Sequence, residues 1–240
     1  MMGDGKKVLG IIGGLGPLAT SYFMKKIVLM TDASTDQEHI RMIIYNCPDI
    51  PDRTRYILDK SAQDPLPYMK DVALRLQSDG ACKIAIPCVT AQFYHNRLQE
   101  GLDIPVQNGV KEAADYLRES GCKSVGILAT DGTVESNLFG LELEKYGISY
   151  IYPSAEDQKI IMSIIYDCVK AGKKPDDSVL MQISRNLRKQ GAERVILGCT
   201  ELSVIKEWFD LPPCFLDMLD VMARSCVKSF SKLRKEYEVL

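Results

Sequence analysis

Two cysteines stand at equivalent places in two similar stretches of this chain of 240 residues. Residues 80–90 read Gly-Ala-Cys-Lys-Ile-Ala-Ile-Pro-Cys-Val-Thr, and residues 191–200 read Gly-Ala-Glu-Arg-Val-Ile-Leu-Gly-Cys-Thr. In both, a cysteine (Cys88 or Cys199) follows the glycine by eight residues, after an apolar run typical of a buried strand. A lone cysteine there is usually a core thiol. The repetition favours a site with two facing thiols.

Two opposed thiols suit one kind of chemistry, in which a proton leaves one face of a carbon and returns on the other. A free thiol has a pKa of about 8.5, so one member of the pair must be held as a thiolate by hydrogen-bond donors or positive charge. The pair would titrate as a unit and exchange roles during the reaction. The pattern therefore predicts a racemase or an epimerase. A disulfide is the alternative, and the chain has no C-x-x-C redox motif in its favour.

Polar residues follow the thiols or lie in loops expected at the same end of the sheets. Thr90 and Thr200 could hydrogen-bond a thiolate or a substrate carboxylate. Glu201 could orient a thiol, bind a substrate ammonium group or cap the next helix. Arg53 lies in a loop bounded by prolines, where its planar guanidinium could grip a carboxylate. Lys170 ends a helix. The simpler interpretations are that Arg53 is a solvated loop residue and that Lys170 interacts only with the dipole of the helix that it ends.

A glycine-rich loop, Gly14-Leu-Gly-Pro-Leu-Ala19, formally matches the G-x-G-x-x-G/A dinucleotide fingerprint. That fingerprint requires an acidic residue at the end of the next strand, which here ends Tyr45-Asn-Cys47. A nicotinamide or flavin cofactor is therefore not expected. A tight turn between strand and helix is favoured, and backbone N–H groups that hold a substrate carboxylate are the third interpretation.

Strands and helices alternate along the chain, which predicts an α/β fold with parallel sheets. The order of the first half recurs in the second, where Asp210-Leu-Pro212 corresponds to Asp103-Ile-Pro105. We expect an internal duplication: an N-terminal lobe over residues 1–109, a C-terminal lobe over 110–217, and 218–240 returning to the first. Strands are expected at 7–12, 40–46, 104–106, 124–129 and 149–152 and before each cysteine, and helices at 18–31, 67–78, 155–169 and 177–190, with others ending near 117 and 146 and one at the C-terminus.

The composition is that of an ordinary globular protein, with 46% hydrophobic and 26% charged residues and a net charge of −2. This balance favours neither a nucleic acid nor a membrane as partner, and no apolar run is long enough to span a bilayer. The N-terminus lacks the pattern of a signal peptide. The eight cysteines are therefore expected to be reduced thiols in a cytoplasmic protein.

Several motifs together resemble the aspartate/glutamate racemase family over about residues 7–220. They are Gly13-Gly-Leu-Gly-Pro-Leu-Ala-Thr20, Asp36-Gln-Glu-His39, Ile50-Pro-Asp-Arg-Thr54, Ala129-Thr-Asp-Gly-Thr133 and Gly198-Cys-Thr-Glu201. The resemblance implies two pseudo-symmetric α/β lobes, a homodimer, and racemisation of a small acidic amino acid, aspartate before glutamate. It implies catalysis by two cysteines with neither pyridoxal phosphate nor a metal ion.

The same resemblance implies roles for particular residues. Cys88 and Cys199 would be the acid/base thiols. Arg53 and Lys170 would bind the side-chain carboxylate of the substrate, and the loop that contains Leu15 would line the pocket. Three threonines would hold the α-carboxylate or support the thiols: Thr90, Thr130 and Thr200.

The first cysteine motif departs from the family pattern. The family usually has Pro-Cys-Asn-Thr-Ala-His, and this chain has Pro87-Cys-Val-Thr-Ala-Gln92. Val89 thus stands where an amide would contact the substrate, a loss of about 1–3 kcal/mol if its partner stays unsatisfied. Gln92 replaces a histidine. Two alternatives stay open: a related isomerase or decarboxylase, similar to maleate isomerase or hydantoin racemase, and a non-catalytic carboxylate-binding protein.

Overall fold

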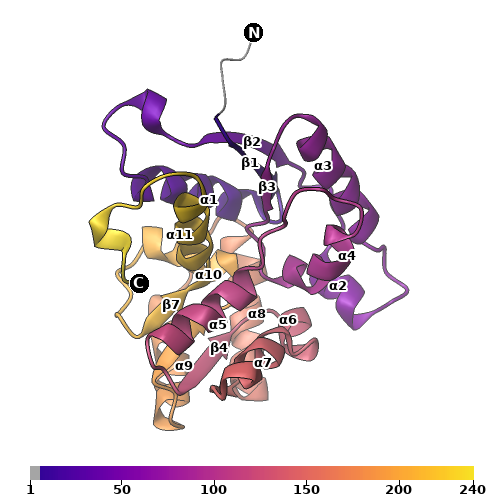
Figure 1. The fold of residues 1–240 in the computed structure, drawn as a ribbon. Helices are drawn as coiled ribbons and strands as arrows, with labels where there is room; N and C mark the ends of the chain where they lie inside the picture. Colours follow the sequence, from indigo (N-terminus) through magenta and orange to yellow (C-terminus); the bar gives the residue numbers. More distant parts are fainter. Residues whose placement is uncertain (1–5) are drawn as a thin grey trace.

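The computed structural model describes residues 6–240 and contains two parallel sheets, one in each half of the chain (Figure 1). The first has the order β2-β1-β3 and the second the order β5-β4-β6-β7. The strands are β1 (Val8–Gly13), β2 (Arg41–Asn46), β3 (Lys83–Ala85), β4 (Ser124–Leu128), β5 (Ser149–Ile151), β6 (Arg194–Leu197) and β7 (Phe215–Asp217). The predicted α/β fold with two parallel sheets is confirmed.

The predicted strand at 104–106 is reduced to one parallel bridge between Val106 and Ile84, beyond β3. This bridge occupies the place in the first sheet that β7 occupies in the second, so the two sheets share one strand order. Residues 1–5, which the sequence assigns to the first lobe, lie outside the described part of the chain.

Helices flank both sheets. The α-helices are α1 (Pro17–Met30), α2 (Arg53–Leu58), α3 (Leu66–Ser78), α4 (His95–Gln99), α5 (Gly109–Glu119), α6 (Asp131–Glu135), α7 (Leu138–Leu143), α8 (Ala155–Ser163), α9 (Asp177–Lys189), α10 (Thr200–Val204) and α11 (Met218–Phe230). Short 3-10 turns are η1 (Asp36–Glu38), η2 (Thr90–Tyr94), η3 (Glu144–Tyr146), η5 (Ile205–Glu207) and η6 (Lys235–Tyr237), and η4 (Ile164–Val169) is a π-helix. No helix within residues 6–240 combines the length and apolarity that a membrane crossing requires.

One close contact between a central strand and a helix is built twice. A Cβ on Gly10 in β1 would lie 3.3 Å from Leu76 of α3, and one on Gly126 in β4 would lie 2.8 Å from Leu187 of α9. Each of these helices is followed by a glycine in the left-handed conformation, which ends the helix before the next strand. The halves therefore repeat a packing arrangement as well as a strand order.

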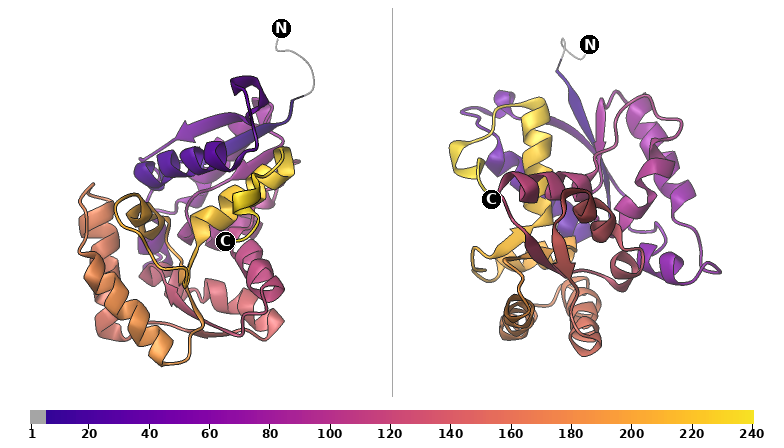
Figure 2. Two further views of the ribbon diagram at one scale, coloured as in Figure 1. Left: turned by 90° about the vertical axis from the view of Figure 1, so that its left-hand side faces the viewer. Right: turned by 60° about the horizontal axis from the view of Figure 1, so that its bottom comes forward.

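The last helix joins the two halves. α11 begins directly after β7 and packs against α1 and α5, and it runs between the halves in Figure 2. Gln107 Nε2 donates to the carbonyl of Met222 in α11 (2.9 Å) and to Glu112 of α5 (2.8 Å). A Cβ on Gly109 would lie 2.7 Å from Met222, so only glycine permits this approach. The lobe boundaries themselves remain a prediction.

Candidate active site

Cys88 and Cys199 line one narrow cavity of about 10 Å³. Cys88 follows β3 and Cys199 follows β6, so each thiol is delivered by the carboxyl end of a parallel strand, where open α/β sheets commonly bind ligands. Each cysteine is 5% exposed. The volume is roughly that of one water molecule. The cavity is lined by Leu15, Asp52, Arg53, Thr54, Cys88, Thr90, Thr130, Tyr166, Lys170, Cys199 and Glu201.

The thiol of Cys199 faces a carboxylate. Its Sγ donates to Glu201 Oε2 at 2.9 Å, and Lys170 Nζ lies 2.7 Å from Glu201 Oε1. The Glu201 side chain is 5% exposed and that of Lys170 is 24% exposed. Burial and the Glu201 carboxylate raise the pKa of Cys199 well above its ordinary value, although Lys170 acts in the opposite direction.

A π-helix positions Lys170. The N–H of Lys170 donates to the carbonyl of Ile165, five residues earlier, as the last bond of η4. π turns of this kind often occur at functional sites. Burial lowers the pKa of Lys170, but the charges of Glu201 and Cys199 outweigh it and raise the pKa overall. The ammonium group is therefore charged at neutral pH.

Arg53, at the start of α2, is 7% exposed and holds the loops around the cavity. Its Nη1 donates to the carbonyls of Ile50 (3.2 Å) and Pro51 (3.1 Å), and its Nη2 donates to the carbonyl of Leu15 (2.9 Å). Its buried Nε has no hydrogen-bond partner in the described part of the chain. Burial lowers the pKa of Arg53, but its interactions with Cys88, Asp52 and Glu201 outweigh this effect and raise the pKa.

Three buried threonine hydroxyls form a cluster beside the thiols. Thr90 Oγ1 lies 2.9 Å from Thr130 Oγ1 and 3.2 Å from Thr133 Oγ1, and the last two are 3.1 Å apart. A hydroxyl can rotate its proton toward a new acceptor, so the cluster can turn its donors to a carboxylate. Thr200 has another role, because its Oγ1 donates to the carbonyl of Pro87 (3.1 Å) and so supports the turn before Cys88.

The two residues that depart from the family motif lie outside the cavity. Val89 is 1% exposed and packs into the apolar core of the second half, and it lines neither described cavity of the site. A contact between Val89 and the substrate therefore stays a prediction. Gln92 accepts from the N–H of Gly109 (3.2 Å) and donates to the carbonyl of Ile86 (3.4 Å). Gln92 thus ties the Cys88 segment to the start of α5.

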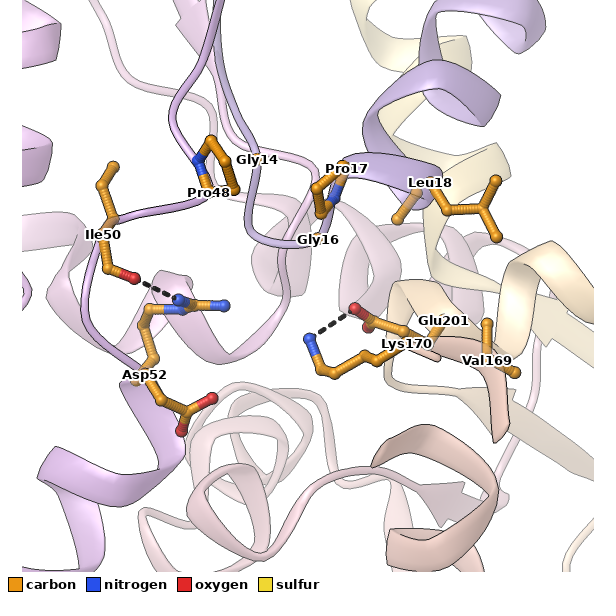
Figure 3. A pocket seen from close by; sticks show the side chains of 12 residues that line it. Gly14, Gly16, Pro17, Leu18, Pro48, Ile50, Asp52, Val169, Lys170 and Glu201 are labelled. Carbon is orange, nitrogen blue, oxygen red and sulfur yellow. Dashed lines mark hydrogen bonds and ion pairs between the residues drawn. The ribbon is translucent and has the colours of Figure 1, made fainter. Parts of the chain in front are cut away.

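A second cavity of about 290 Å³ adjoins the first, and Asp52, Arg53, Lys170 and Glu201 line both. Figure 3 shows the Lys170–Glu201 pair with Ile50 and Asp52 across from it. The remaining lining residues are Gly14, Gly16, Pro17, Leu18, Ala19, Pro48 and Val169.

The glycine-rich loop forms one wall of this outer cavity. Gly14 has a φ of 91°, and a Cβ there would lie 2.5 Å from the backbone of Cys47. A Cβ on Gly16 would lie 3.0 Å from Glu201 Oε1. The glycines therefore serve a tight turn and a close approach.

Four residues of the site were not predicted. Asp52, Thr54 and Tyr166 line the inner cavity, and Thr133 completes the threonine cluster. Tyr166 Oη donates to Asp52 Oδ2 (3.1 Å), a contact between segments far apart in the chain. The available signal was spacing, because Tyr166 precedes Lys170 by four residues, which places both on one face of a helix.

Acidic and cysteine side chains line this site, but nowhere in residues 6–240 do three or more histidine, cysteine or acidic side chains form a group suited to a metal ion. All eight cysteines are free thiols.

Comparison with known proteins matches this chain to amino-acid racemases in sequence and in structure. The family model "Asp/Glu/Hydantoin racemase" matches residues 12–226. The broad specificity amino-acid racemase RacX of Bacillus subtilis (strain 168) is 25% identical over 93% of this chain and 98% of its own. The aspartate racemase of Picrophilus torridus has a TM-score of 0.85 and 31% identity over 96% of this chain and 97% of its own. A glutamate racemase of Francisella tularensis shares the fold, with a TM-score of 0.65 and 19% identity over 93% and 80% of the two chains.

Proposed function

The chain belongs to the Asp/Glu/hydantoin racemase family and is an amino-acid racemase, and we propose that it interconverts the L- and D-forms of an acidic amino acid with Cys88 and Cys199 as the two bases. One observation carries the proposal. Two thiols, delivered by strands of two separate sheets, line a single buried cavity together with Arg53 and Lys170.

The proposed reaction needs one thiolate and one thiol. The thiolate takes the α-proton from one face of the substrate, and the electron pair of the C–H bond stays on the carbon. The opposite thiol then gives its proton to the other face. The threonine hydroxyl cluster is the proposed site of the α-carboxylate, because its donors lie beside both cysteines. Neither pyridoxal phosphate nor a metal ion takes part in this scheme.

Aspartate is the first candidate substrate. A solved aspartate racemase is similar over nearly the whole of both chains. Arg53 and Lys170 line the cavity with both thiols, and we expect their cations to bind the substrate side chain. A second candidate is a wider range of amino acids. Glu201 forms an ion pair with Lys170, Asp52 lines the cavity with Arg53, and the outer cavity has apolar walls at Leu18, Ile50 and Val169. The relative in Bacillus subtilis is named for broad specificity.

A chiral assay over a panel of L- and D-amino acids in deuterium oxide, without added cofactor, tests the proposal. We expect deuterium at Cα to accompany formation of the opposite enantiomer, with aspartate converted fastest. The values of kcat/KM for the two enantiomers should agree, because enantiomers have equal free energies. Conversion of no amino acid would refute the proposed reaction, and would leave the other isomerases of this fold or a carboxylate-binding protein.

Single substitutions identify the bases. Cys88→Ser and Cys199→Ser should each reduce racemisation by at least about a hundredfold, the scale typical of a lost general base. Cys226→Ser is the matched control, because Cys226 is equally buried but hydrogen-bonds Gln107 far from the cavity. Full activity in either active-site variant would refute the two-thiol mechanism.

Two further properties belong to the proposal. A cytoplasmic location suits a reaction that needs reduced thiols. The homodimer that the family resemblance implies is tested by light scattering of the full chain at assay concentration.

A further inference from the structure

We propose that Tyr166 is a positioning residue for recognition of the substrate side chain. Its hydroxyl keeps the Asp52 carboxylate away from Arg53, and its ring lies beside the ammonium group of Lys170. The inference deepens the proposed function and rests on one part of it, the assignment of Arg53 and Lys170 to the substrate side chain. Tyr166 lines the inner cavity together with these three residues and both thiols.

The hydroxyl of Tyr166 occupies one oxygen of the Asp52 carboxylate. Tyr166 Oη donates to Asp52 Oδ2 (3.1 Å), and burial raises the pKa of Tyr166, so the phenol keeps its proton at neutral pH. The other oxygen, Oδ1, accepts from the backbone N–H of Arg55 (2.8 Å) as the N-cap of α2. Both oxygens of Asp52 therefore have donors other than the Arg53 side chain.

Arg53 directly follows Asp52 in the chain, yet its guanidinium is directed elsewhere. Its hydrogen bonds within residues 6–240 go to three backbone carbonyls and not to Asp52. In Figure 3 the Asp52 side chain points away from Ile50, which provides one of these carbonyls. A carboxylate and a guanidinium form strong, often paired hydrogen bonds. Without the hydroxyl of Tyr166, we expect Asp52 Oδ2 to turn toward Arg53 and to compete with a substrate carboxylate.

The ring of Tyr166 lies beside the other cation of the cavity. Lys170 Nζ is 5.4 Å from the centroid of the ring, within the range of a cation–π interaction. The nearby anion is Glu201, whose carboxylate lies 2.7 Å from Lys170 Nζ. Tyr166 belongs to the π-helix that ends directly before Lys170. One side chain thus contacts the positioning partner of Arg53 and also Lys170, although the two cations come from different halves of the chain.

Ligand binding tests this role without any turnover. Succinate has the two carboxylates of aspartate and no amino group, and succinamate is the same molecule with one carboxylate replaced by an amide. NMR titration of the full-length protein gives the dissociation constant of each. We expect the wild type to prefer succinate, and Tyr166→Phe to lose about threefold to tenfold of that preference with its hydrogen bond. A folded Tyr166→Phe protein with the wild-type preference would overturn the role.

Tyr146→Phe is the matched control. Tyr146 Oη also donates to an aspartate, Asp115 (2.6 Å), and the guanidinium of Arg118 lies 4.8 Å from the centroid of its ring. Tyr146 lines neither cavity of the site, so this substitution should leave the preference for succinate unchanged. An equal change in the two variants would show a general effect of losing a tyrosine hydroxyl, and would overturn the role of Tyr166.

A substitution at Asp52 separates positioning from a merely structural role. Asp52→Asn keeps a side-chain oxygen for the N-cap and removes the charge that would compete for Arg53. Added to Tyr166→Phe, it should restore most of the preference for succinate. Alone, it should prefer succinate at least as strongly as the wild type, and this result decides the proposal if Tyr166→Phe does not fold. A double variant no better than Tyr166→Phe, or a weaker preference in Asp52→Asn, would overturn the proposal.

These measurements need no racemisation, so the two proposals fail separately. A protein that racemises amino acids but keeps its preference for succinate in Tyr166→Phe would refute only the role of Tyr166. A protein with the predicted binding that converts no amino acid would refute only the proposed reaction. A wild type without a preference for succinate would overturn the inference together with the assignment of Arg53 and Lys170 on which it rests.

Discussion

Replacing Lys170 with methionine should destabilise the protein because Glu201 would be left as a buried charge with no partner. The Glu201 side chain is only 5% exposed, and Lys170 Nζ lies 2.7 Å from its carboxylate. Removing one member of a buried ion pair costs about 3–5 kcal/mol. Because Lys170 is 24% exposed, water can replace part of the interaction, and we expect a loss of about 2–4 kcal/mol.

Thermal denaturation measures this loss. For a chain of this size each kcal/mol lowers Tm by about 2–4 °C, so Lys170→Met should lower Tm by roughly 5–15 °C at neutral pH. The double variant Lys170→Met/Glu201→Gln should recover much of the difference, because no charge is then buried.

The chain offers a matched control in an exposed pair. Lys145 Nζ also lies 2.7 Å from a carboxylate, that of Glu142, but the Lys145 side chain is 59% exposed. Lys145→Met should change the stability by less than about 1 kcal/mol. An equal effect of the two substitutions, or a Lys170→Met protein as stable as the wild type, would show that Glu201 is solvated in solution and would refute the reasoning.

Three other substitutions test separate parts of the structure. Tyr166→Phe removes the hydrogen bond to Asp52 across the cavity. It should raise KM several-fold in steady-state kinetics, while Tm changes little. An unchanged KM would show that this hydrogen bond does not contribute to substrate binding. Gln92→Leu removes the hydrogen bonds from Gln92 to the Gly109 N–H and the Ile86 carbonyl. The free energy of unfolding, measured with denaturant, should fall by about 1–3 kcal/mol. Wild-type stability would mean that these bonds do not form. Gly126→Ala places a Cβ 2.8 Å from Leu187 and should cost about 1–3 kcal/mol of stability through overpacking. At the exposed Gly147 an added Cβ would have nothing within 4 Å, so Gly147→Ala shows the cost of a positive φ (65°) alone. A Gly126→Ala protein with unchanged Tm would count against the tight strand–helix contact.

Much of the fold could be predicted from local pattern. The alternation of apolar strands with helices predicts parallel sheets, and the repeated spacing from glycine to cysteine identifies two equivalent strands. Both signals are local, because burial on both faces makes a strand apolar throughout and a left-handed glycine ends the helix before it. The start of α2, at Arg53, was predicted as part of a loop because Pro48 and Pro51 precede it. An aspartate is a common N-cap residue, and Asp52 does cap α2, because it accepts a hydrogen bond from the N–H of Arg55 (2.8 Å).

The candidate site was less predictable, because its contacts join distant segments. Lys170 and Glu201 are 31 residues apart, and only the assembled fold brings them to 2.7 Å. The direction of Val89 also depends on tertiary structure. Val89 follows the strand in a turn, where the alternation of side chains no longer applies, and its side chain enters the core of the second half.

The π-helix Ile164–Val169 sets which side chain of this segment faces the cavity. Successive residues of an α-helix are about 100° apart around the axis, so one additional residue in a turn redirects every side chain that follows it. The π turn follows α8, and Lys170, directly after it, lines the cavity with both thiols. A relative without this residue would keep the fold and present another side chain to the cavity. An insertion in this turn would therefore change the residue that faces the cavity, as a substitution of Lys170 would.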